Sequence, residues 1–596
     1  MLIWYYLLQH FQWLHSCFRH KTETLNDVLD MVEEDASGDE ADVILIPPEG
    51  DVSDGYSGPE DEGEGDPDHL SAPILKSEAE LQRRKSSRTE TTHQPTARRH
   101  QAHHTVTWMK PAPSSGKPTR LFPEANFSQF SGMSPNELVT LFLGEEIFDL
   151  TIKESSLYAL RNGRQDPQLS REDIAIFIGI LVLTSYLTAV NTRFYWQEAA
   201  DTHNELICQA MTRNRFDTIK RNLHFCSEED PADRYWKLRP LIKILQVKYM
   251  EHFVPQQAIS HDEAMIAYFG RHGLKQAIRN KPIRFGFKAW AQNTPDGYLL
   301  AFDFYQGRGV AEHTDDNVQL VGKSGAAVLD LLEHMKQEFR ELPFQFFVDN
   351  YFMSIPLMQE MTKRGYDVTG TIRENRIPGT TGLSATKEFR KKERGMHQAV
   401  TSRDGNVILV RWQDNAPVTL ASTCYGDVPP GKVRRYSRVQ KRHVEVDRPH
   451  VVGKYNEMMG GTDRMDQNVN HCRIAVKGKK WWWPIFTWLV DTAVHNAWRL
   501  HCRAGGTMTY VQFRREYACT ILRRWARGSK PMMNRNLAAP GSEAIRFDGM
   551  GHIIIKAPSR GTCRNEGCTA KVGTKCVKCA VFLCVNCFAG FHGVAQ

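Results

Sequence analysis

Hydrophobic residues recur at helical spacing through residues 121–257, and this pattern predicts a mostly helical region. Ser134-Pro-Asn-Glu137 is typical of a helix start, with Ser at the N-cap, Pro at the first helical position and Glu three residues after the cap. Leu138, Leu141 and Phe142 then fall on one face of that helix. A second start, Ser170-Arg-Glu-Asp173, opens a segment rich in Ile and Leu.

The pattern changes near Gln257, after which short β-branched or aromatic runs alternate with turns. Helical patterns separate the later runs, over Ser324–Leu342 and Ser354–Arg364. The alternation predicts a mixed α/β sheet over residues 258–374. The runs predicted as strands are Ala258–Ser260, Tyr298–Phe304, Phe344–Val348 and Tyr366–Ile372.

The rest of the chain divides by changes in composition. Residues 375–449 are rich in Gly, Pro and Lys, with a hairpin predicted between Asn406–Trp412 and Pro417–Ala421. They look inserted, because apolar patterning resumes after Val451 and residues 450–472 complete the α/β region. A basic, aromatic and helical segment is expected over 473–545. A linker over 546–559 and a cysteine-rich tail over 560–596 follow.

Residues 1–120 are expected to be a disordered N-terminal region: residues 21–120 combine low hydrophobicity with segregated charge, and the first 17 residues are an apolar segment expected to be amphipathic and untethered. Between Asp27 and Asp68 there are 17 acidic residues and no Lys or Arg, and a basic part with Gln82-Arg-Arg-Lys-Ser-Ser-Arg88 follows. That basic cluster suits a nuclear import signal. The sequence therefore predicts a nuclear protein with an acidic, then basic, N-terminal region.

The net charge of +7 over 596 residues conceals a strongly basic body. Outside the acidic segment, 52 acidic residues face 76 Lys and Arg, a balance of +24. Such a balance favours a polyanionic partner, most simply nucleic acid, although an ordinary soluble surface is the alternative. No run of about 18 apolar residues occurs, so neither a membrane-spanning helix nor a membrane partner is expected.

Six of the 13 cysteines fall within the last 34 residues. Cys576-Val-Lys-Cys579 and Cys584-Val-Asn-Cys587 have the C-x-x-C spacing that lets two thiolates reach one tetrahedral zinc ion. The other seven cysteines are scattered singly, as in a reduced protein without disulfides. Seven clear zinc ligands are predicted, and His552, far upstream, is a possible eighth. The seven are Cys563, Cys568, Cys576, Cys579, Cys584, Cys587 and His592.

Acidic residues occupy the ends of predicted strands. Asp262 follows the first strand, Asp349 ends the strongly apolar Phe344–Val348 strand, and Asp463 and Asp466 lie three apart in Gly460–Gln467. Each acid alone has an ordinary reading, as a turn cap, a loop start or a solvated helix face. Carboxylates at strand ends can also be brought together by a sheet, and such hard oxygen ligands suit Mg²⁺ or Mn²⁺.

The residues around these acids resemble the piggyBac family of DNA transposases and their relatives, the piggyBac transposable element-derived proteins. The resemblance covers roughly residues 122–596, and several spaced motifs occur in the right order. The motifs are Asp262-Glu263, Phe269-Gly-Arg271, Asn280-Lys-Pro282, Gly286-Phe-Lys288, Asp349-Asn-Tyr-Phe-Met-Ser-Ile-Pro356, Tyr455-Asn-Glu-Met-Met-Gly-Gly-Thr-Asp-Arg-Met-Asp-Gln467, Trp483-Pro484 and the cysteine-rich tail.

The resemblance implies an RNase H-like catalytic core with an insertion domain. It also implies a flanking helical domain for dimerisation and DNA binding, and a C-terminal cross-brace module with two zinc ions. Asp262, Asp349 and Asp463 match the family's catalytic, metal-binding triad, and Asp466 matches a further aspartate of the third motif. The implied reaction is metal-dependent strand cleavage at transposon ends, with DNA hairpin intermediates and joining to TTAA targets. Proton transfer would fall to the metal ions, so His261 is not expected to act as a general base.

Three basic groups are expected to contact DNA. Lys477, Lys479 and Lys480 stand beside three tryptophans, where cations can neutralise phosphates and a ring can stack on an unpaired base. For Trp481 and Trp482 a place in the core is an equal alternative, whereas Trp483 belongs to the family's Trp-Pro motif. The remaining expected contacts are Arg271, Lys281 and Lys288 near the first aspartate, and Arg434 and Arg435 in a charged stretch of the insertion.

Two other functions compete with an active transposase. The chain could be a domesticated descendant that binds DNA or chromatin without transposition, or an adaptor whose zinc-binding tail recruits proteins. The presence of all three triad aspartates favours the enzyme over the decayed descendant.

Overall fold

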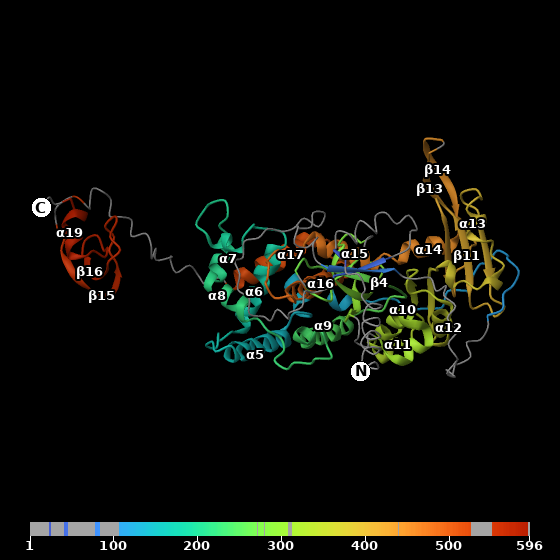
Figure 1. Cartoon of the computed structure of the whole chain (residues 1–596), viewed down its shortest axis with the longest axis horizontal. Helices are drawn as coiled ribbons and strands as arrows, with labels where there is room; N and C mark the ends of the chain where they lie inside the picture. Colours follow the sequence, from blue (N-terminus) through green and yellow to red (C-terminus); the bar gives the residue numbers. More distant parts are fainter. Residues whose placement is uncertain are drawn as a thin grey trace, which may run out of the picture. The chain divides into compact units, whose positions relative to one another are not determined.

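The computed structural model describes residues 106–270, 272–278, 281–307, 313–438, 440–525, 547 and 551–593, together with the backbone of three short strands nearer the N-terminus. The chain divides into two compact units, Met1–Trp525 and Ala526–Gln596 (Figure 1). Among the described residues, no helix is both long enough and apolar enough to cross a membrane.

Residues 121–257 of the first unit are mostly helical, as the sequence predicts. Ser134 caps the first one through a capping box with Glu137, and Ser170 makes the same arrangement with Asp173. From Asp173 to Thr184 every residue of α6 is buried, so this helix forms the centre of the helical part. The helices are α4 (Pro135–Thr140), α5 (Glu145–Arg161), α6 (Arg171–Thr184), α7 (Glu205–Ala210), α8 (Arg213–Asn222) and α9 (Arg239–Glu251), with 3₁₀ turns at Ser128–Phe130, Thr192–Trp196 and Trp236–Leu238.

A mixed sheet follows, with β4 (Ala258–Ala267) between β6 (Phe285–Asn293) and β8 (Gln345–Val348). β7 (Leu299–Phe304) pairs antiparallel with β6, and β6 pairs antiparallel with β4. β8 lies parallel to β4, and β9 (Asp367–Thr371) lies parallel to β8. The five strands thus have the spatial order β7-β6-β4-β8-β9, which confirms the prediction of a mixed α/β sheet.

The segment expected as an insertion continues this sheet. The predicted hairpin is present as β11 (Ile408–Gln413) and β12 (Pro417–Ser422), and β12 pairs antiparallel with β9. β10 (His397–Thr401) adds a strand beyond β11. Its hydrogen bonds therefore join the segment to the central sheet, which patterning along the chain could not show. Before β10 the chain forms short helical turns at Glu374–Arg376, Gly379–Thr381 and Thr386–Phe389 (α13). After β12 it forms a second hairpin, β13 (Gly431–Ser437) and β14 (Arg442–Arg448).

At the opposite edge of the sheet, strands are present in the region that the sequence predicted to be disordered, residues 1–120. β5 (Gln276–Ala277) pairs with β6 and also with β2 (Ala41–Leu45). β3 (Glu78–Arg83) lies between β2 and β1 (Glu23–Thr24). An unpaired sheet edge can recruit a polar segment through backbone hydrogen bonds, so low hydrophobicity did not prevent these strands from forming.

Helices that follow the strands cover the sheet. α10 (Asp315–Glu333), α11 (Gln337–Arg340) and α12 (Ile355–Lys363) come before β9. The sequence predicted one helix over Ser324–Leu342. The structure instead has α10, which starts earlier and ends at Glu333, and the separate short helix α11. After the insertion come α14 (His450–Met458), α15 (Gly461–His471), α16 (Trp483–Arg503) and α17 (Tyr510–Arg524).

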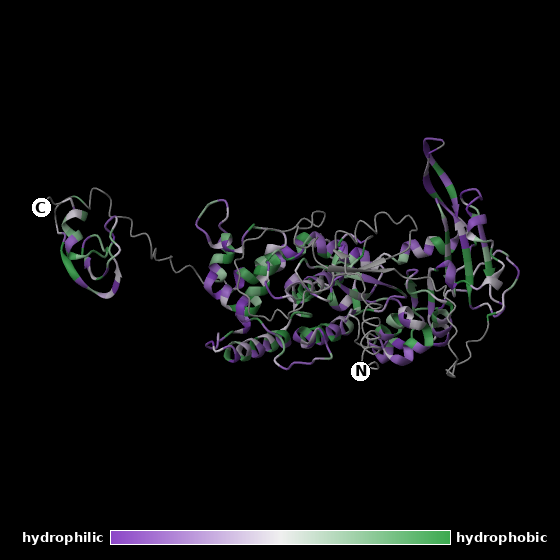
Figure 2. Ribbon diagram, in the orientation of Figure 1, coloured by the Kyte–Doolittle hydropathy of each residue, from purple (hydrophilic) through white to green (hydrophobic). Residues whose placement is uncertain are grey.

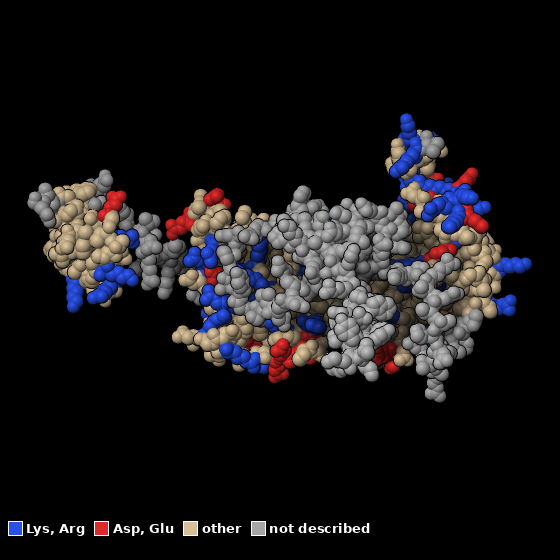
Figure 3. All heavy atoms as spheres, viewed as in Figure 1, with Lys and Arg blue, Asp and Glu red and all other residues tan. Residues whose placement is uncertain are grey.

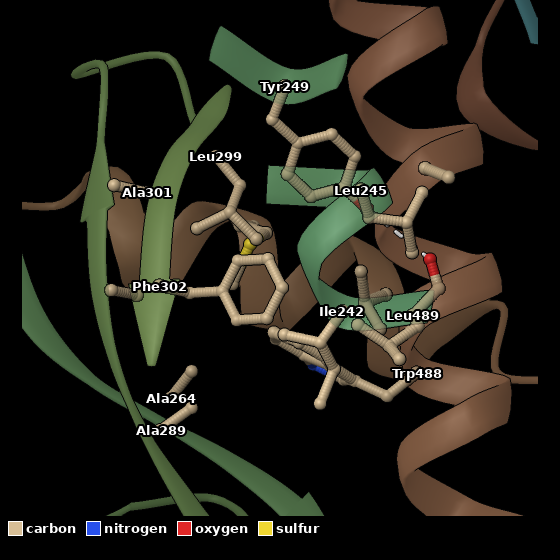
Figure 4. Packing of buried hydrophobic residues seen from close by; sticks show 14 of the residues in the cluster. Ile242, Leu245, Tyr249, Ala264, Ala289, Leu299, Ala301, Phe302, Trp488 and Leu489 are labelled. Carbon is tan, nitrogen blue, oxygen red and sulfur yellow. Dashed lines mark hydrogen bonds between the residues drawn. The ribbon is translucent and has the colours of Figure 1, made fainter. Parts of the chain in front are cut away.

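The helices after residue 473 return to those before residue 257. α16 packs against α4 and α9, and α17 packs against α4 and α6. Figure 4 shows side chains of α9, β7 and α16 meeting in one buried cluster, to which Leu245, Phe302 and Trp488 belong. The sheet and both helical segments thus share a single core.

The second unit is small. It contains β15 (Ile554–Thr562), β16 (Lys571–Cys576) and α19 (Val585–Phe591), with β15 antiparallel to β16. β15 begins inside the segment predicted as a linker over 546–559, so the ordered tail starts earlier than its cysteines suggest.

Candidate active site and metal centres

The register of two parallel strands brings Asp262 and Asp349 together. His261 of β4 pairs with Val348 of β8, so the next residue of each strand, Asp262 and Asp349, lies abreast of the other. Oxygens of Asp262, Asp349 and Glu263 lie within 4.8 Å of one another. Of the acids predicted from sequence, these two aspartates form the centre of the site.

The loop after β8 fixes Asp349. Its Oδ1 accepts a hydrogen bond of 2.7 Å from the backbone N–H of Tyr351, and its carbonyl accepts one from Met353. Ser354 then caps α12, with Pro356 in the first turn of the helix. The sequence Asp-Asn-Tyr-Phe-Met-Ser-Ile-Pro thus ends a strand, turns the chain and starts a helix within eight residues.

Asp463 reaches the same site from the first turn of α15. Thr462 Oγ1 donates a hydrogen bond of 2.9 Å to Asn293 Oδ1, which holds the start of the helix on β6. A Cβ at Gly461 would lie 2.3 Å from both Ser260 Oγ and the Thr294 carbonyl. The helix can therefore approach the two strands only because this position is glycine.

Lys281 bridges the acids from the two elements. Its Nζ lies 2.8 Å from Asp262 Oδ2 and 3.1 Å from Asp463 Oδ1. Burial alone would raise the pKa of Asp262, but the Lys281 ammonium and hydrogen bonds from Glu263 outweigh it and lower that pKa below its usual range. The ammonium supplies positive charge at the point where the carboxylates converge. A cation bound by these carboxylates would have to displace this ammonium.

Asp466 lies one helical turn beyond Asp463 and is buried. Its Oδ2 accepts a hydrogen bond of 3.4 Å from the N–H of Met265, on the part of β4 that extends past the end of β8. Burial raises its pKa to about 7, against the opposing effect of Lys281. Asp466 therefore joins α15 to β4, and its burial favours the protonated form more than in an ordinary aspartate.

Glu263 belongs to the carboxylate group, although the sequence reasoning did not select it. Burial and the neighbouring Asp262 hold its pKa well above the usual range. The sequence did contain a signal for Glu263. Asp262 and Glu263 are consecutive acids in a strand of buried residues, and buried carboxylates need partners, so both belong to one site. The residue was noted only as part of a motif.

Three of the predicted DNA-contacting residues make contacts within the protein. Lys288 is buried, with Nζ 3.9 Å from the centre of the Trp290 ring, and Trp483 is buried with its Nε1 donating to the Val476 carbonyl. Lys480 Nζ donates to the Arg221 and Leu223 carbonyls at the end of α8. In this structure these three side chains contact other parts of the protein.

Lys477, Lys479 and Arg434 are exposed, as a DNA contact requires. Arg435 is half-buried and its Nε donates to Asp414. Arg271 lies outside the described residues. Trp482, for which the core was one of two equal alternatives, is 1% exposed and therefore lies in the core.

The second unit holds two groups of metal-ligating side chains, and each group has four members. In both groups the ligand atoms lie within 4.8 Å of one another. His552 is the eighth residue that the sequence left open, because Cys576 Sγ and Cys579 Sγ lie 3.5 Å and 3.6 Å from its Nδ1. One group is Cys563, Cys568, Cys584 and Cys587, and the other is His552, Cys576, Cys579 and His592.

The two groups interleave along the chain. The pairs Cys563 and Cys568, Cys576 and Cys579, and Cys584 and Cys587 belong to alternating groups, and the two histidines of the second group lie before and after all of these cysteines. Sets of four thiol and imidazole donors fit structural zinc. β15 separates His552 from Cys563 by 11 positions, so local spacing did not reveal His552 as a ligand.

Comparison with known proteins identifies the family. A family model described as Transposase IS4 matches residues 134–498. The human PiggyBac transposable element-derived protein 3 is 33% identical over 96% of this chain and 99% of its own length. The chain belongs to the piggyBac family.

Two further comparisons agree. The human PiggyBac transposable element-derived protein 2 is 32% identical over 76% of this chain and 75% of its own length. A cryo-EM structure of a piggyBac transposase synaptic complex with hairpin DNA has a TM-score of 0.54 at 20% identity, covering 71% of this chain and 86% of the other. The mixed α/β fold is thus similar to that of a piggyBac transposase.

Proposed function

We propose that this piggyBac-family chain is a DNA transposase whose catalytic acids are Asp262, Asp349 and Asp463, assisted by Asp466. One observation carries the proposal: Asp262 of β4 lies beside Asp349, directly after the parallel strand β8, and Lys281 links Asp262 to Asp463 on α15. Oxygens of Asp262, Glu263 and Asp349 lie within 4.8 Å of one another, and Asp463, whose side chain is 65% exposed, is connected to them through Lys281. A purely structural role would not require neighbouring carboxylates, because like charges repel.

We further propose that the core is RNase H-like. The order β7-β6-β4-β8-β9 supports this, with three antiparallel strands first and two more strands parallel to β4. Asp262 within β4 and Asp349 directly after β8 then occupy neighbouring positions. Residues 375–449 are the proposed insertion domain, and the helices on either side of the core are the proposed dimerisation and DNA-binding domain.

The carboxylates fit a hard divalent ion of the Mg²⁺ or Mn²⁺ class, because only oxygen donors converge there and an ammonium already bridges two of them. Asp262, Asp349 and Asp463 would hold it. When bound, such an ion activates water and stabilises the leaving oxygen in phosphodiester cleavage. Asp349 is oriented by the N–H of Tyr351, and Asp466 is oriented by the N–H of Met265.

The remaining parts of the proposal follow from the family. They are hairpin intermediates at transposon ends, TTAA target sites, a homodimer acting on paired DNA ends, and a nuclear location. Two zinc ions in the second unit would support contacts with DNA or a chromatin protein. Lys477, Lys479 and Arg434 are proposed DNA contacts because they are exposed and basic.

The test is cleavage of DNA that carries the gene's own flanking terminal repeats, with Mg²⁺ and the full chain. Asp349→Asn should abolish nicking and hairpin formation but leave DNA binding intact, because only one metal-binding oxygen is lost. Asp316→Asn is the matched control, since Asp316 is exposed at the start of α10. Retained cleavage by Asp349→Asn would refute the assignment of the acids.

A second function is favoured by the names of the human relatives, which are described as transposable element-derived. A chain of that kind would bind DNA or chromatin without transposing it. Specific binding without cleavage by the wild-type protein, with zinc and Mg²⁺ present, would support this function over the transposase.

A further inference from the structure

The hairpin of β13 and β14 forms a two-stranded ribbon whose members pair only with each other. Seven consecutive residue pairs join the strands, from Gly431–Arg448 to Ser437–Arg442. At about 3.3 Å per residue, the paired part is about 20 Å long. Figure 1 shows the ribbon extending beyond the neighbouring strands of the first unit.

The base of the ribbon is fixed to the rest of the unit. Val446 is buried, and Val433 and Val444 pack against the same cluster of apolar residues. Trp412 Nε1 donates a hydrogen bond of 2.9 Å to the Asp447 carbonyl, and Arg435 Nε donates one of 3.0 Å to Asp414. One end of the ribbon is therefore held by the core, and Arg435 contributes to that attachment.

The outer end of the ribbon, residues 436–443, has a different composition. It contains Arg438, Lys441 and Arg442 and no acidic residue, and all three cations are exposed. The acids of the ribbon, Glu445 and Asp447, lie nearer its base. Figure 3 shows Lys and Arg side chains gathered at the outer end, and Figure 2 shows that end as hydrophilic.

Two aromatic rings accompany these cations. Tyr436 is 53% exposed and pairs across the strands with His443, with their ring centroids 5.6 Å apart. Rings and guanidinium groups on a stiff ribbon can contact base edges and phosphates together. A surface that only maintained solubility would mix charges of both signs, as the base of this ribbon does.

We propose that the outer end of the β13–β14 ribbon inserts into the major groove of double-stranded DNA. The groove is about 12 Å wide and admits a two-stranded ribbon, whose strands lie about 5 Å apart. The positive outer end complements the phosphates that border the groove. The proposal rests on the proposed function, since it requires that the chain handles duplex DNA.

The first experiment measures binding of the full chain to a random-sequence duplex several helical turns long, without divalent ions. The test variant is Arg438→Gln, Lys441→Gln and Arg442→Gln together. The control variant is Lys387→Gln, Arg390→Gln and Lys391→Gln, which removes the same charge from exposed positions of the same inserted segment. We expect at least about tenfold weaker binding for the test variant only, and a slope of log affinity against log salt smaller by up to about three.

A second experiment identifies the groove. Glucosylated hydroxymethylcytosine fills the major groove, and netropsin fills the minor groove of A·T-rich DNA. We expect glucosylated DNA to abolish the difference between the wild type and the test variant, and netropsin to preserve it. An RNA duplex, whose major groove is too narrow for side chains, should show no difference between them.

The outcomes separate this proposal from the proposed function. Duplex binding by the wild type with equal loss in the test and control variants, or with no loss in either, would overturn the ribbon proposal alone. An effect that netropsin removes and glucosylation preserves would also overturn it. No binding of the random duplex by the wild type would overturn the ribbon proposal, and no binding of the gene's own terminal repeats either would overturn both proposals. If the triple variant does not fold, Arg438→Gln alone should give a smaller change with the same dependence on glucosylation.

Discussion

At the scale of single residues, the candidate active site depends on one cation and one glycine. Lys281 links Asp262 to Asp463, and Gly461 lets the helix that carries Asp463 approach the sheet. Neither residue is an acid, so a search for metal ligands does not identify them. Each controls how closely the acids of β4 and α15 converge.

Lys281→Met should strengthen the binding of divalent ions. The ammonium competes with an incoming ion for Asp262 and Asp463, and without it the carboxylates retain more negative charge. We expect about tenfold tighter binding of Mn²⁺ to the DNA-free chain, a change of about 1.4 kcal/mol. Calorimetric titration measures it, with Lys363→Met as an exposed control. Unchanged or weaker Mn²⁺ binding would show that Lys281 does not occupy the position of the ion.

Gly461→Ala should impair cleavage in a protein that still folds. The added Cβ would collide with Ser260 and with the Thr294 backbone, so α15 has to move and take Asp463 with it. A displacement of about 1 Å at a catalytic group costs on the order of a hundredfold in rate.

Gly460→Ala is the matched control for this prediction, because its nearest neighbour would be an Arg464 atom at 3.9 Å. Single-turnover cleavage rates of Gly461→Ala and Gly460→Ala test the prediction. Equal rates for the two would show that the position of α15 is not critical.

At the scale of elements, the second unit shows how a short strand can separate ligands of one site. β15 lies between His552 and Cys563, yet its pairing with β16 returns His552 to Cys576 and Cys579. The hairpin therefore assembles the group to which His592 also belongs. Closed sites of this kind contribute directly to folding when they hold zinc.

His552→Ala should reduce the zinc content of the full chain from about two ions to about one. The group of Cys563, Cys568, Cys584 and Cys587 keeps all its donors, so its ion should remain. Elemental analysis of dialysed protein measures the ratio, and His334→Ala, an exposed histidine at the end of α10, is the control. A variant that keeps both ions would exclude His552 as a ligand.

At the scale of the whole first unit, the sheet and the two helical segments are joined by polar contacts as well as by the core. Asp296, in the turn between β6 and β7, accepts hydrogen bonds of 2.7 Å from Arg499 and 2.6 Å from Arg503 of α16. Burial alone would raise the pKa of Asp296, but the two arginines and Thr294 hold it well below its usual range. The turn and the helix are about 200 residues apart in sequence, so this contact stabilises the tertiary arrangement.

Asp296→Asn should lower the free energy of unfolding by about 2 kcal/mol near neutral pH, because it leaves two arginines without their anionic partner. The depressed pKa means that the wild-type advantage is complete above about pH 4, the ordinary pKa of Asp, and is lost as the pH falls further. The difference in Tm between wild type and variant should therefore shrink in acid. Scanning calorimetry at several pH values tests this, with Asp316→Asn as the exposed control. A difference that grows in acid would contradict the assignment.

The sequence by itself determined the local elements and most of the donor set. The expectation that the first strand ends before Asp262 was wrong, because β4 continues through it to Ala267. The capping boxes at Ser134 and Ser170, the end of β8 before Asp349 and the seven clustered ligands of the tail depend on neighbours a few positions away. Local propensity and spacing therefore predicted them. The mixed α/β region was recognisable for the same reason, since each strand and helix has its own periodicity.

Only the tertiary structure decided which residues meet. The pairing of β9 with β12, the convergence of Lys281 on two acids and the inclusion of Glu263 and His552 all join segments distant in sequence. It also placed Lys288 and Trp483 in the interior, where composition had suggested DNA contacts. The physical reason is that burial and pairing depend on the register and packing of whole elements, and the side chains of a single segment do not specify these.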